Sequence, residues 1–136
     1  MIKIKIAISG SMLFSKEMLK KKTELEKLNH KVTIPKNAKE FAENKIEVED
    51  KWKKLEIDAI RSYFNEIKKC DSILVLNITK NNIENYIGGN SLIEIAFAHV
   101  LKKKIFLYNP APKMSYTDEI ISMKPIIINQ DIKKIK

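Results

Sequence analysis

Glu94 is the residue whose surroundings in the sequence point most directly to chemistry. It follows the segment Gly88-Gly-Asn-Ser-Leu-Ile and lies within residues 92–101, where eight of ten residues are apolar. A helix that is apolar nearly all round is buried between a sheet and its neighbours. A carboxylate in such a helix costs desolvation free energy unless it is paired or faces a cleft. Glu94 is therefore a candidate catalytic residue, and Gly88, Gly89 and Asn90 are candidate ligand-binding residues.

A capping box is the alternative explanation for a glutamate at this place. Ser91 and Glu94 match the S-x-x-E pattern, in which the glutamate bonds back to the amide of the capping serine. The pattern does not account for Gly88 and Gly89 ahead of it. At the level of the sequence both interpretations of Glu94 stand.

A second candidate site is the segment Ser9, Gly10, Ser11 and Met12. It follows isoleucines that alternate from Ile2 to Ile8, and it precedes a helical pattern that begins near Ser15. A glycine lets the backbone approach a ligand, and amides at a helix N-terminus suit an anion such as phosphate. The segment predicts an anion-binding loop, although any strand-to-helix turn can also require a glycine.

The elements that must position these residues alternate between strands and helices. Residues 72–77 are almost continuously apolar, which is typical of a strand buried on both faces and therefore parallel. The other strands are predicted at 2–8, 31–35, 104–108 and 125–128, the helices at 15–29, 52–67, 92–101 and 116–123, and a polar excursion with a helical turn near Phe41 at 36–50.

Right-handed βαβ crossovers between such elements produce a parallel sheet with helices on both faces. We predict one domain, residues 1–136, with a flavodoxin-like doubly wound fold: three layers, α/β/α, around five parallel strands in the order 2-1-3-4-5. Ligands bind outside the carboxyl ends of the strands in such sheets. Ser9–Met12, Asn77 and Gly88–Glu94 are expected to meet there.

Composition excludes several classes of function. The net charge is +9, but 25 of the 26 basic residues are lysines and only Arg61 carries the planar guanidinium that reads bases and clamps phosphates. We therefore predict no specific nucleic-acid partner. The longest apolar segment has about ten residues, against the ~20 that span a bilayer, so no membrane partner is expected.

The sequence also implies no cofactor and no metal. It has one cysteine, Cys70, so no intrachain disulfide can form, and a cytoplasmic location is expected. Cys70 has no clustered histidine or second cysteine that would form a metal site with it. No Walker loop and no long glycine-rich dinucleotide motif is present.

Several segments together carry a resemblance to a known family. Ile8-Ser-Gly-Ser11, Cys70-Asp-Ser-Ile-Leu-Val-Leu76, Gly88-Gly-Asn-Ser-Leu-Ile-Glu94-Ile-Ala-Phe-Ala98 and Lys103-Lys-Ile-Phe-Leu107 occur in that order along nearly the whole chain. They resemble the nucleoside 2-deoxyribosyltransferase family and the related deoxynucleoside 5'-monophosphate N-glycosidases. The resemblance implies cleavage or transfer of an N-glycosidic bond, with a small nucleoside or nucleotide as the partner.

The resemblance also implies roles for single residues. Glu94 corresponds to the glutamate that attacks the anomeric carbon of the sugar. The loop of Gly10, Ser11 and Met12 resembles the one that holds the sugar or its 5'-phosphate, and Asn90 is expected to bond the sugar.

The family forms dimers or larger assemblies in which a neighbouring subunit completes the pocket. The resemblance therefore implies a homodimer or a dimer of dimers. Here the neighbour would contribute residues near Ser122 and Met123.

Three positions depart from the family pattern, one of them Ala7, which stands where family members often have a tyrosine in the first strand. Tyr63, a candidate pocket residue, stands where family members usually have an aspartate, and Gly88 stands where the transferases have another. The alternative is therefore a nucleotide-binding or sensor module of the same fold that lacks catalysis. In a third interpretation the fold is only structural and Glu94 only caps a helix.

Overall fold

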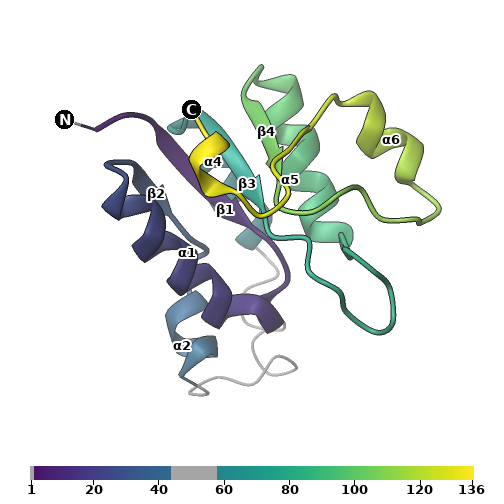
Figure 1. Ribbon diagram of the computed structural model, residues 1–136, viewed down its shortest axis with the longest axis horizontal. Coiled ribbons are helices and arrows are strands. Elements are labelled where there is room, and N and C mark those ends of the chain that lie inside the picture. The colour runs from purple at the N-terminus through teal and green to yellow at the C-terminus, as the bar shows by residue number, and fades with distance from the viewer. Residues whose placement is uncertain (1, 44–57) are drawn as a thin grey trace.

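Five parallel strands form one sheet at the centre of the protein. The computed structural model describes residues 2–43 and 58–136. The strands are β1 (Lys5–Ser9), β2 (Lys31–Thr33), β3 (Ser72–Val75), β4 (Lys104–Leu107) and β5 (Ile126–Ile127), in the order β2-β1-β3-β4-β5 (Figure 1). All four pairings are parallel. The predicted strand order and the flavodoxin-like fold are confirmed.

Helices cover both faces of the sheet (Figure 1). They are α1 (Ser15–Lys27), α2 (Ala38–Ala42), α4 (Ala59–Lys68), α5 (Gly89–Val100) and α6 (Thr117–Ser122), with short 3-10 helices η1 (Met12–Phe14) and η2 (Ile132–Lys134). One apolar core joins α1, α2 and the residues around η2 to one face, and the other joins α4, α5 and α6 to the opposite face. The protein is therefore a three-layer α/β/α structure.

Alternation along the strands assigns side chains to these two cores. In β3, Ile73 and Val75 lie in the core beneath α4 and α5, while Leu74 lies in the core beneath α1. All four residues of β3 are buried, as its apolar sequence predicts. A strand whose two faces are both covered by helices has no position for an exposed polar side chain.

The ends of α1 show where local signals succeeded and failed. Asn29, the last residue of the predicted helix 15–29, has a φ of 71°, the left-handed conformation that stops a helix. Ser15, where the helical pattern was expected to begin, is the first residue of the helix, and Phe14 is at the cap position. Ser11 caps η1 instead, because its hydroxyl accepts a hydrogen bond from the Leu13 amide.

Two predicted segments are only partly described. The helical turn expected near Phe41 is α2, in which Phe41 is buried, while residues 44–50 of the polar excursion lie outside the described residues. The helix expected over 52–67 is described from Ala59, as α4, and 52–57 lie outside the described residues.

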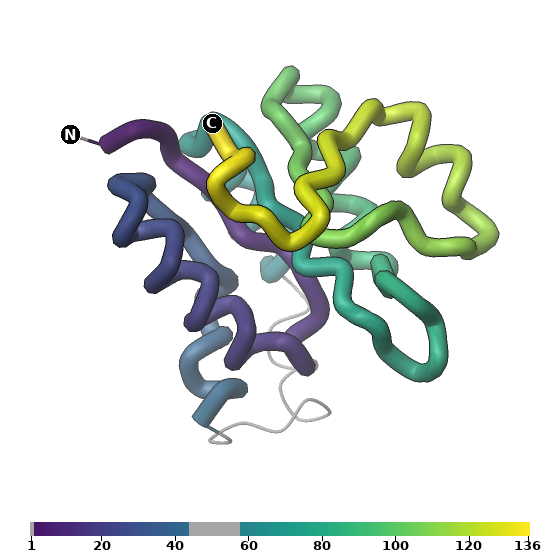
Figure 2. The backbone as a smooth tube through the Cα atoms, viewed as in Figure 1, coloured from purple at the N-terminus to yellow at the C-terminus, as the bar shows by residue number. Residues whose placement is uncertain are grey.

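The carboxyl ends of β1 and β3 lie beside each other in the sheet, with Ser9 paired to Val75. After β3 the chain runs through a long loop away from the sheet before α5 begins (Figure 2). This loop and the β1–α1 turn border the carboxyl edge of the sheet, where the candidate site lies.

Candidate functional site

Glu94 lies inside α5 and does not cap it. The helix begins at Gly89 with Gly88 at the cap position, so Ser91 is its third residue and Glu94 belongs to its second turn. No side chain makes a capping hydrogen bond at this end of the helix. The capping-box interpretation is wrong because the motif requires Ser91 at the cap position, whereas the cap is Gly88 and the helix begins three residues earlier than the motif requires.

The carboxylate of Glu94 is bound to the central strand. Ser9, the last residue of β1, is fully buried and its hydroxyl donates a hydrogen bond to Oε1 of Glu94. Burial raises the pKa of Glu94 to about 7, and the hydrogen bond from Ser9 opposes that rise. Near neutral pH the residue therefore exists as both carboxylate and acid, as is suitable for catalysis.

Tyr63 is buried in the core, close enough to Glu94 to be affected by its charge. Its side chain is 6% exposed, and its hydroxyl lies 2.5 Å from the carbonyl oxygen of Ile8 and 3.2 Å from that of Thr33. Burial, and then the negative charge of Glu94, raise the pKa of Tyr63 well above its ordinary value. Tyr63 is thus a neutral phenol that is tied to the backbone of β1 and β2.

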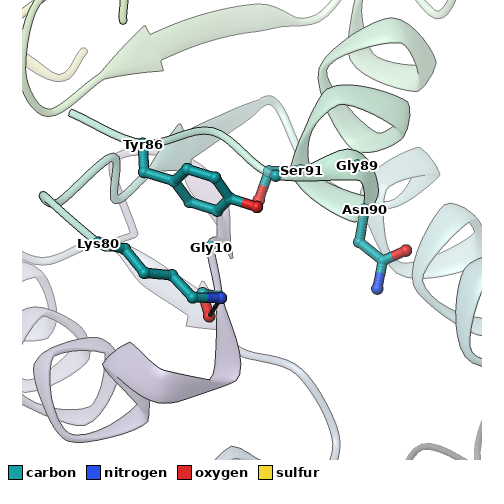
Figure 3. Close-up of a pocket in the computed structure, with 8 residues that line it drawn as sticks. Gly10, Lys80, Tyr86, Gly89, Asn90 and Ser91 are labelled. Carbon is teal, nitrogen blue, oxygen red and sulfur yellow. Dashed lines mark hydrogen bonds between the residues drawn. The ribbon is translucent and has the colours of Figure 1, made fainter. Parts of the chain in front are cut away.

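A cavity of about 170 Å³ opens between the β1–α1 turn and the start of α5 (Figure 3). Five of the predicted binding residues line it, namely Gly10, Ser11, Gly88, Gly89 and Asn90. Lys80, Tyr86 and Ser91 complete the lining. The structure therefore brings the glycine-rich start of α5 together with the predicted anion-binding loop.

Lys80 is the cavity residue that sequence reasoning missed. Its ammonium group donates a hydrogen bond of 3.2 Å to Ser11 Oγ and lies 5.1 Å from the centre of the Tyr86 ring. Figure 3 shows Lys80 and Tyr86 on one side of the opening and Asn90 on the other. One lysine among 25 carries no sequence signal. The two asparagines that follow it, Asn81 and Asn82, adopt left-handed conformations in a turn.

Gly88 and Gly89 differ in the space around them. A Cβ atom at Gly88 would lie 3.1 Å from the Tyr86 ring, so the glycine permits that close approach. A Cβ atom at Gly89 would meet no atom within 4 Å. The protein itself does not need a glycine at position 89, where the first backbone amide of α5 borders the cavity.

The other predicted binding residues lie outside the cavity lining. Met12 begins η1 and packs against the core beneath α1, and Met123 packs against the core beneath α5. Ser122 is exposed, and its hydroxyl donates to the carbonyl oxygen of Glu119. Ser122 and Met123 are expected to complete the cavity of a neighbouring subunit. The structure of one chain does not test this role, which stays a prediction.

Asn77 is buried just after the end of β3, and it holds in place the chain that follows the neighbouring strand β4. Its amide nitrogen donates to the carbonyl oxygens of Asn109 and Pro110 at 2.7 and 3.0 Å, and its side-chain oxygen accepts from the Asn109 amide at 2.8 Å. Both polar atoms of the Asn77 side chain are therefore already hydrogen-bonded to other residues of the protein. Its observed contacts hold the chain after β3 and β4 in place.

The described part of the chain has neither a cluster of metal-ligating side chains nor a helix that could span a membrane. No group of three or more histidine, cysteine, aspartate or glutamate side chains among these residues could hold a metal ion. None of the described helices is long and apolar enough to cross a membrane. Comparison of the chain with protein-family models, curated proteins and solved structures finds no match.

The candidate site combines a carboxylate of raised pKa, Glu94, with a small polar cavity that Glu94 itself does not line. The first amides of a helix have no acceptor within the helix and attract anions, and here they adjoin the lysine ammonium. Cavities that enclose drug-sized ligands measure roughly 300–1,000 Å³. A cavity of about 170 Å³ has room for only part of a ligand of that size.

Proposed function

We propose that the protein cleaves or transfers the N-glycosidic bond of a (deoxy)nucleoside or nucleoside 5'-monophosphate through a covalent glycosyl–Glu94 intermediate. The observation that carries this proposal is the Glu94 carboxylate in α5, desolvated and oriented by Ser9, one turn from residues that line a polar cavity. The resemblance of the sequence segments to N-glycosidic enzymes supports the same chemistry.

In the first step, the oxygen of Glu94 that Ser9 does not hold attacks the anomeric carbon of the sugar. A carbon–oxygen ester bond forms as the carbon–nitrogen bond breaks, and the base leaves with the bonding electrons and takes up a proton. The transition state resembles an oxocarbenium ion, as in retaining glycosidases. A carboxylate close to the sugar stabilises that positive charge in a site with little water.

In the second step, water or another base attacks the same carbon and breaks the ester bond, which restores the Glu94 carboxylate. The proton that water gives up balances the one taken by the departing base. Attack requires the ionised form of Glu94. Because burial raises its pKa to about 7, kcat/KM of the free enzyme should rise with pH through that value.

Base release by the wild-type protein and by Glu94→Gln tests this function. Nucleosides and 5'-monophosphates are incubated with each protein, and free base is quantified by chromatography. Wild type should release base, and Glu94→Gln should lose several orders of magnitude in turnover because the nucleophilic charge is gone. Glu66→Gln, a partly exposed acid on α4, should keep wild-type turnover. Equal release by wild type and Glu94→Gln would contradict the proposal.

A nucleotide-binding module without catalysis is the second candidate. It is favoured by the fact that Ser11, Lys80 and the start of α5 line the cavity without any contribution from Glu94. If binding occurs but neither protein releases base from any substrate of the panel, this candidate replaces the enzyme.

We also propose a homodimer or a dimer of dimers in which the cavity is completed by a neighbouring chain. The outer face of α5 exposes apolar side chains, with Val100 77% and Ile93 37% exposed. On the adjacent helix α6, Ile121 is also exposed. A second copy that covers this surface would bring its own α6, and with it Ser122 and Met123, near the open side of the site.

A further inference from the structure

The buried hydroxyl of Tyr63 has no role in the proposed reaction so far. It reaches from α4 to the carboxyl end of the β1–β2 pairing, where it lies 2.5 Å from the carbonyl oxygen of Ile8 and 3.2 Å from that of Thr33. A phenol has one proton, so it donates to the nearer of the two, the carbonyl of Ile8. The hydroxyl therefore binds the backbone at the point where the pairing of the two strands stops.

The pairing stops there because the next hydrogen-bond donor is missing. The Lys31 amide donates to the Ile4 carbonyl at 3.0 Å, and the parallel register continues from these residues. Hydrogen bonds of a parallel ladder recur every two residues, so the amide at position 35 would be the donor to the Ile8 carbonyl. That residue is Pro35, which has no amide hydrogen. The Tyr63 hydroxyl supplies the missing hydrogen bond in its place.

The carbonyl that Tyr63 binds immediately precedes Ser9, the residue that binds Glu94. On the side of β3, the carbonyl of Ser9 accepts a hydrogen bond from the Leu76 amide at 2.8 Å. On the side of β2, the bond from Tyr63 to Ile8 holds the same stretch of backbone. A buried carbonyl without a donor costs free energy, so loss of the phenol hydroxyl would favour movement of this strand end.

Tyr63 can act on Glu94 through position, because its phenol carries no charge. Burial, and then the charge of Glu94, raise the pKa of Tyr63 well above its ordinary value, and Cys70 and Glu66 raise it further. Among the described residues no hydrogen bond joins Tyr63 to Glu94, whose hydrogen-bond donor is Ser9. Tyr63 does not line the cavity either. Its connection to the reacting carboxylate runs through the backbone of β1.

We propose that Tyr63 is a positioning residue of the reaction, whose hydroxyl replaces the ladder donor that Pro35 lacks and thereby holds the Ser9 hydroxyl against Glu94. The inference rests on the proposed function, because it gives a part in that reaction to a residue that does not touch the substrate. Phenylalanine at position 63 keeps the ring in the core and removes only the hydroxyl. The substitution should therefore weaken the bond between Ser9 and Glu94 while both residues are still present.

Titration of the Glu94 carboxyl group by carbon NMR tests this role without any need for turnover. The protein is labelled at the side-chain carboxyl carbon of glutamate, and the Glu94 signal is the one absent from Glu94→Gln. The proteins compared are wild type, Tyr63→Phe, Ser9→Ala, the double variant of these two, and Ile67→Val. Ile67 is the matched control, because it is also buried on α4 in the same core and loses a methyl group without the loss of a hydrogen bond.

Tyr63→Phe should raise the midpoint of the Glu94 titration by about half a unit to one unit, no more than Ser9→Ala does. The double variant should match Ser9→Ala, because without the Ser9 hydroxyl the position of the strand end no longer affects Glu94. Ile67→Val should lower the melting temperature and leave the midpoint unchanged. Cooperative thermal unfolding establishes that each variant is folded.

Two results would overturn the inference. An unchanged Glu94 midpoint in Tyr63→Phe would show that the hydroxyl serves only the stability of the core. An increase of equal size with and without the Ser9 hydroxyl would show that Tyr63 acts on Glu94 by another route. Both results come from the titration, so they are distinct from failure of the proposed function, which is the absence of base release that depends on Glu94.

Discussion

The Ser9 hydroxyl donates a hydrogen bond to Glu94 Oε1, which joins the last residue of the central strand β1 to the second turn of α5. The two residues are 85 positions apart in the sequence. Burial favours the protonated acid, whereas a donor to the carboxylate favours the charged form. The balance leaves Glu94 with a pKa of about 7, so the group is both poorly hydrated and substantially ionised at neutral pH.

Ser9→Ala should move the pH dependence of catalysis upward. Without the hydroxyl, burial acts on Glu94 unopposed and its pKa rises above 7. The midpoint of the rise of kcat/KM with pH should increase by about one unit, the size expected for one hydrogen bond to a charged group. Rates are measured from pH 5 to 10.

Ser72→Ala provides the matched control for Ser9→Ala. Ser72 is also a buried strand serine, at the start of β3, and its hydroxyl has no hydrogen-bond partner among the described residues. Its variant should leave the midpoint unchanged. An identical midpoint in wild type and Ser9→Ala would show that the hydrogen bond does not tune Glu94.

Glu94→Gln should stabilise the fold at alkaline pH. Because the folded-state pKa is raised from 4.5 to about 7, the folded protein binds more protons than the unfolded chain between these values. Stability therefore falls as pH rises through that window, and above it ionised Glu94 costs up to about 3 kcal/mol of unfolding free energy. Glutamine removes this cost, so the gain should be largest near pH 8 and absent near pH 4.

Urea denaturation at pH 4, 6 and 8 measures this effect. Glu66→Gln should show no such pH-dependent gain, because its carboxylate is partly exposed on α4. A stability difference between wild type and Glu94→Gln that is the same at all three pH values would contradict the raised pKa.

The sheet could be predicted because the sequence of each strand indicates which of its faces are buried. The apolar run of β3 indicates burial on both faces, and the alternation of Ile6, Ala7 and Ile8 matches the division of β1 between the two cores. The position of Glu94 as a carboxylate within an apolar helix was evident from the sequence for the same reason, and its catalytic role stays a prediction. The local sequence pattern did not predict the start of α5, which begins two residues before the Ser91-x-x-Glu94 motif.

Contacts between side chains that are distant in the sequence could not be predicted from it. Asn77 was placed correctly at the carboxyl edge of the sheet. The residues next to it in the sequence, however, do not indicate that its side chain forms hydrogen bonds with Asn109. Ser9 was grouped with the anion-binding loop, although its hydroxyl belongs to Glu94. Lys80 acquires its place only when the following turn brings it against Ser11 and Tyr86.

Gly89→Ala should separate ligand binding from folding. A methyl group at Gly89 meets no protein atom within 4 Å, and alanine favours a helix over glycine by up to about 1 kcal/mol. The melting temperature should therefore be equal to or above that of wild type. Because Gly89 lines the cavity, the methyl group should nevertheless weaken binding of 2-deoxyribose 5-phosphate by about tenfold or more.

Gly88→Ala is the informative comparison for Gly89→Ala. A Cβ atom there approaches the Tyr86 ring to 3.1 Å, so this variant must displace the ring that lies beneath Lys80. It should lower both the melting temperature and the affinity. If Gly89→Ala instead binds 2-deoxyribose 5-phosphate as tightly as wild type, the ligand does not approach the start of α5.

Val100→Lys should dissociate the proposed dimer. Val100 is 77% exposed at the end of α5, so lysine fits the monomer without strain, whereas in a two-fold interface the substitution places one charge from each chain near the other. Light scattering should show at least two chains for wild type and one chain of 15.8 kDa for the variant. Ile2→Lys, at a 56% exposed position before β1, should leave the mass unchanged. If wild type itself scatters as a single chain at micromolar concentration, the shared cavity must be abandoned. Glu94, Ser9 and Lys80 must then constitute the site within one chain.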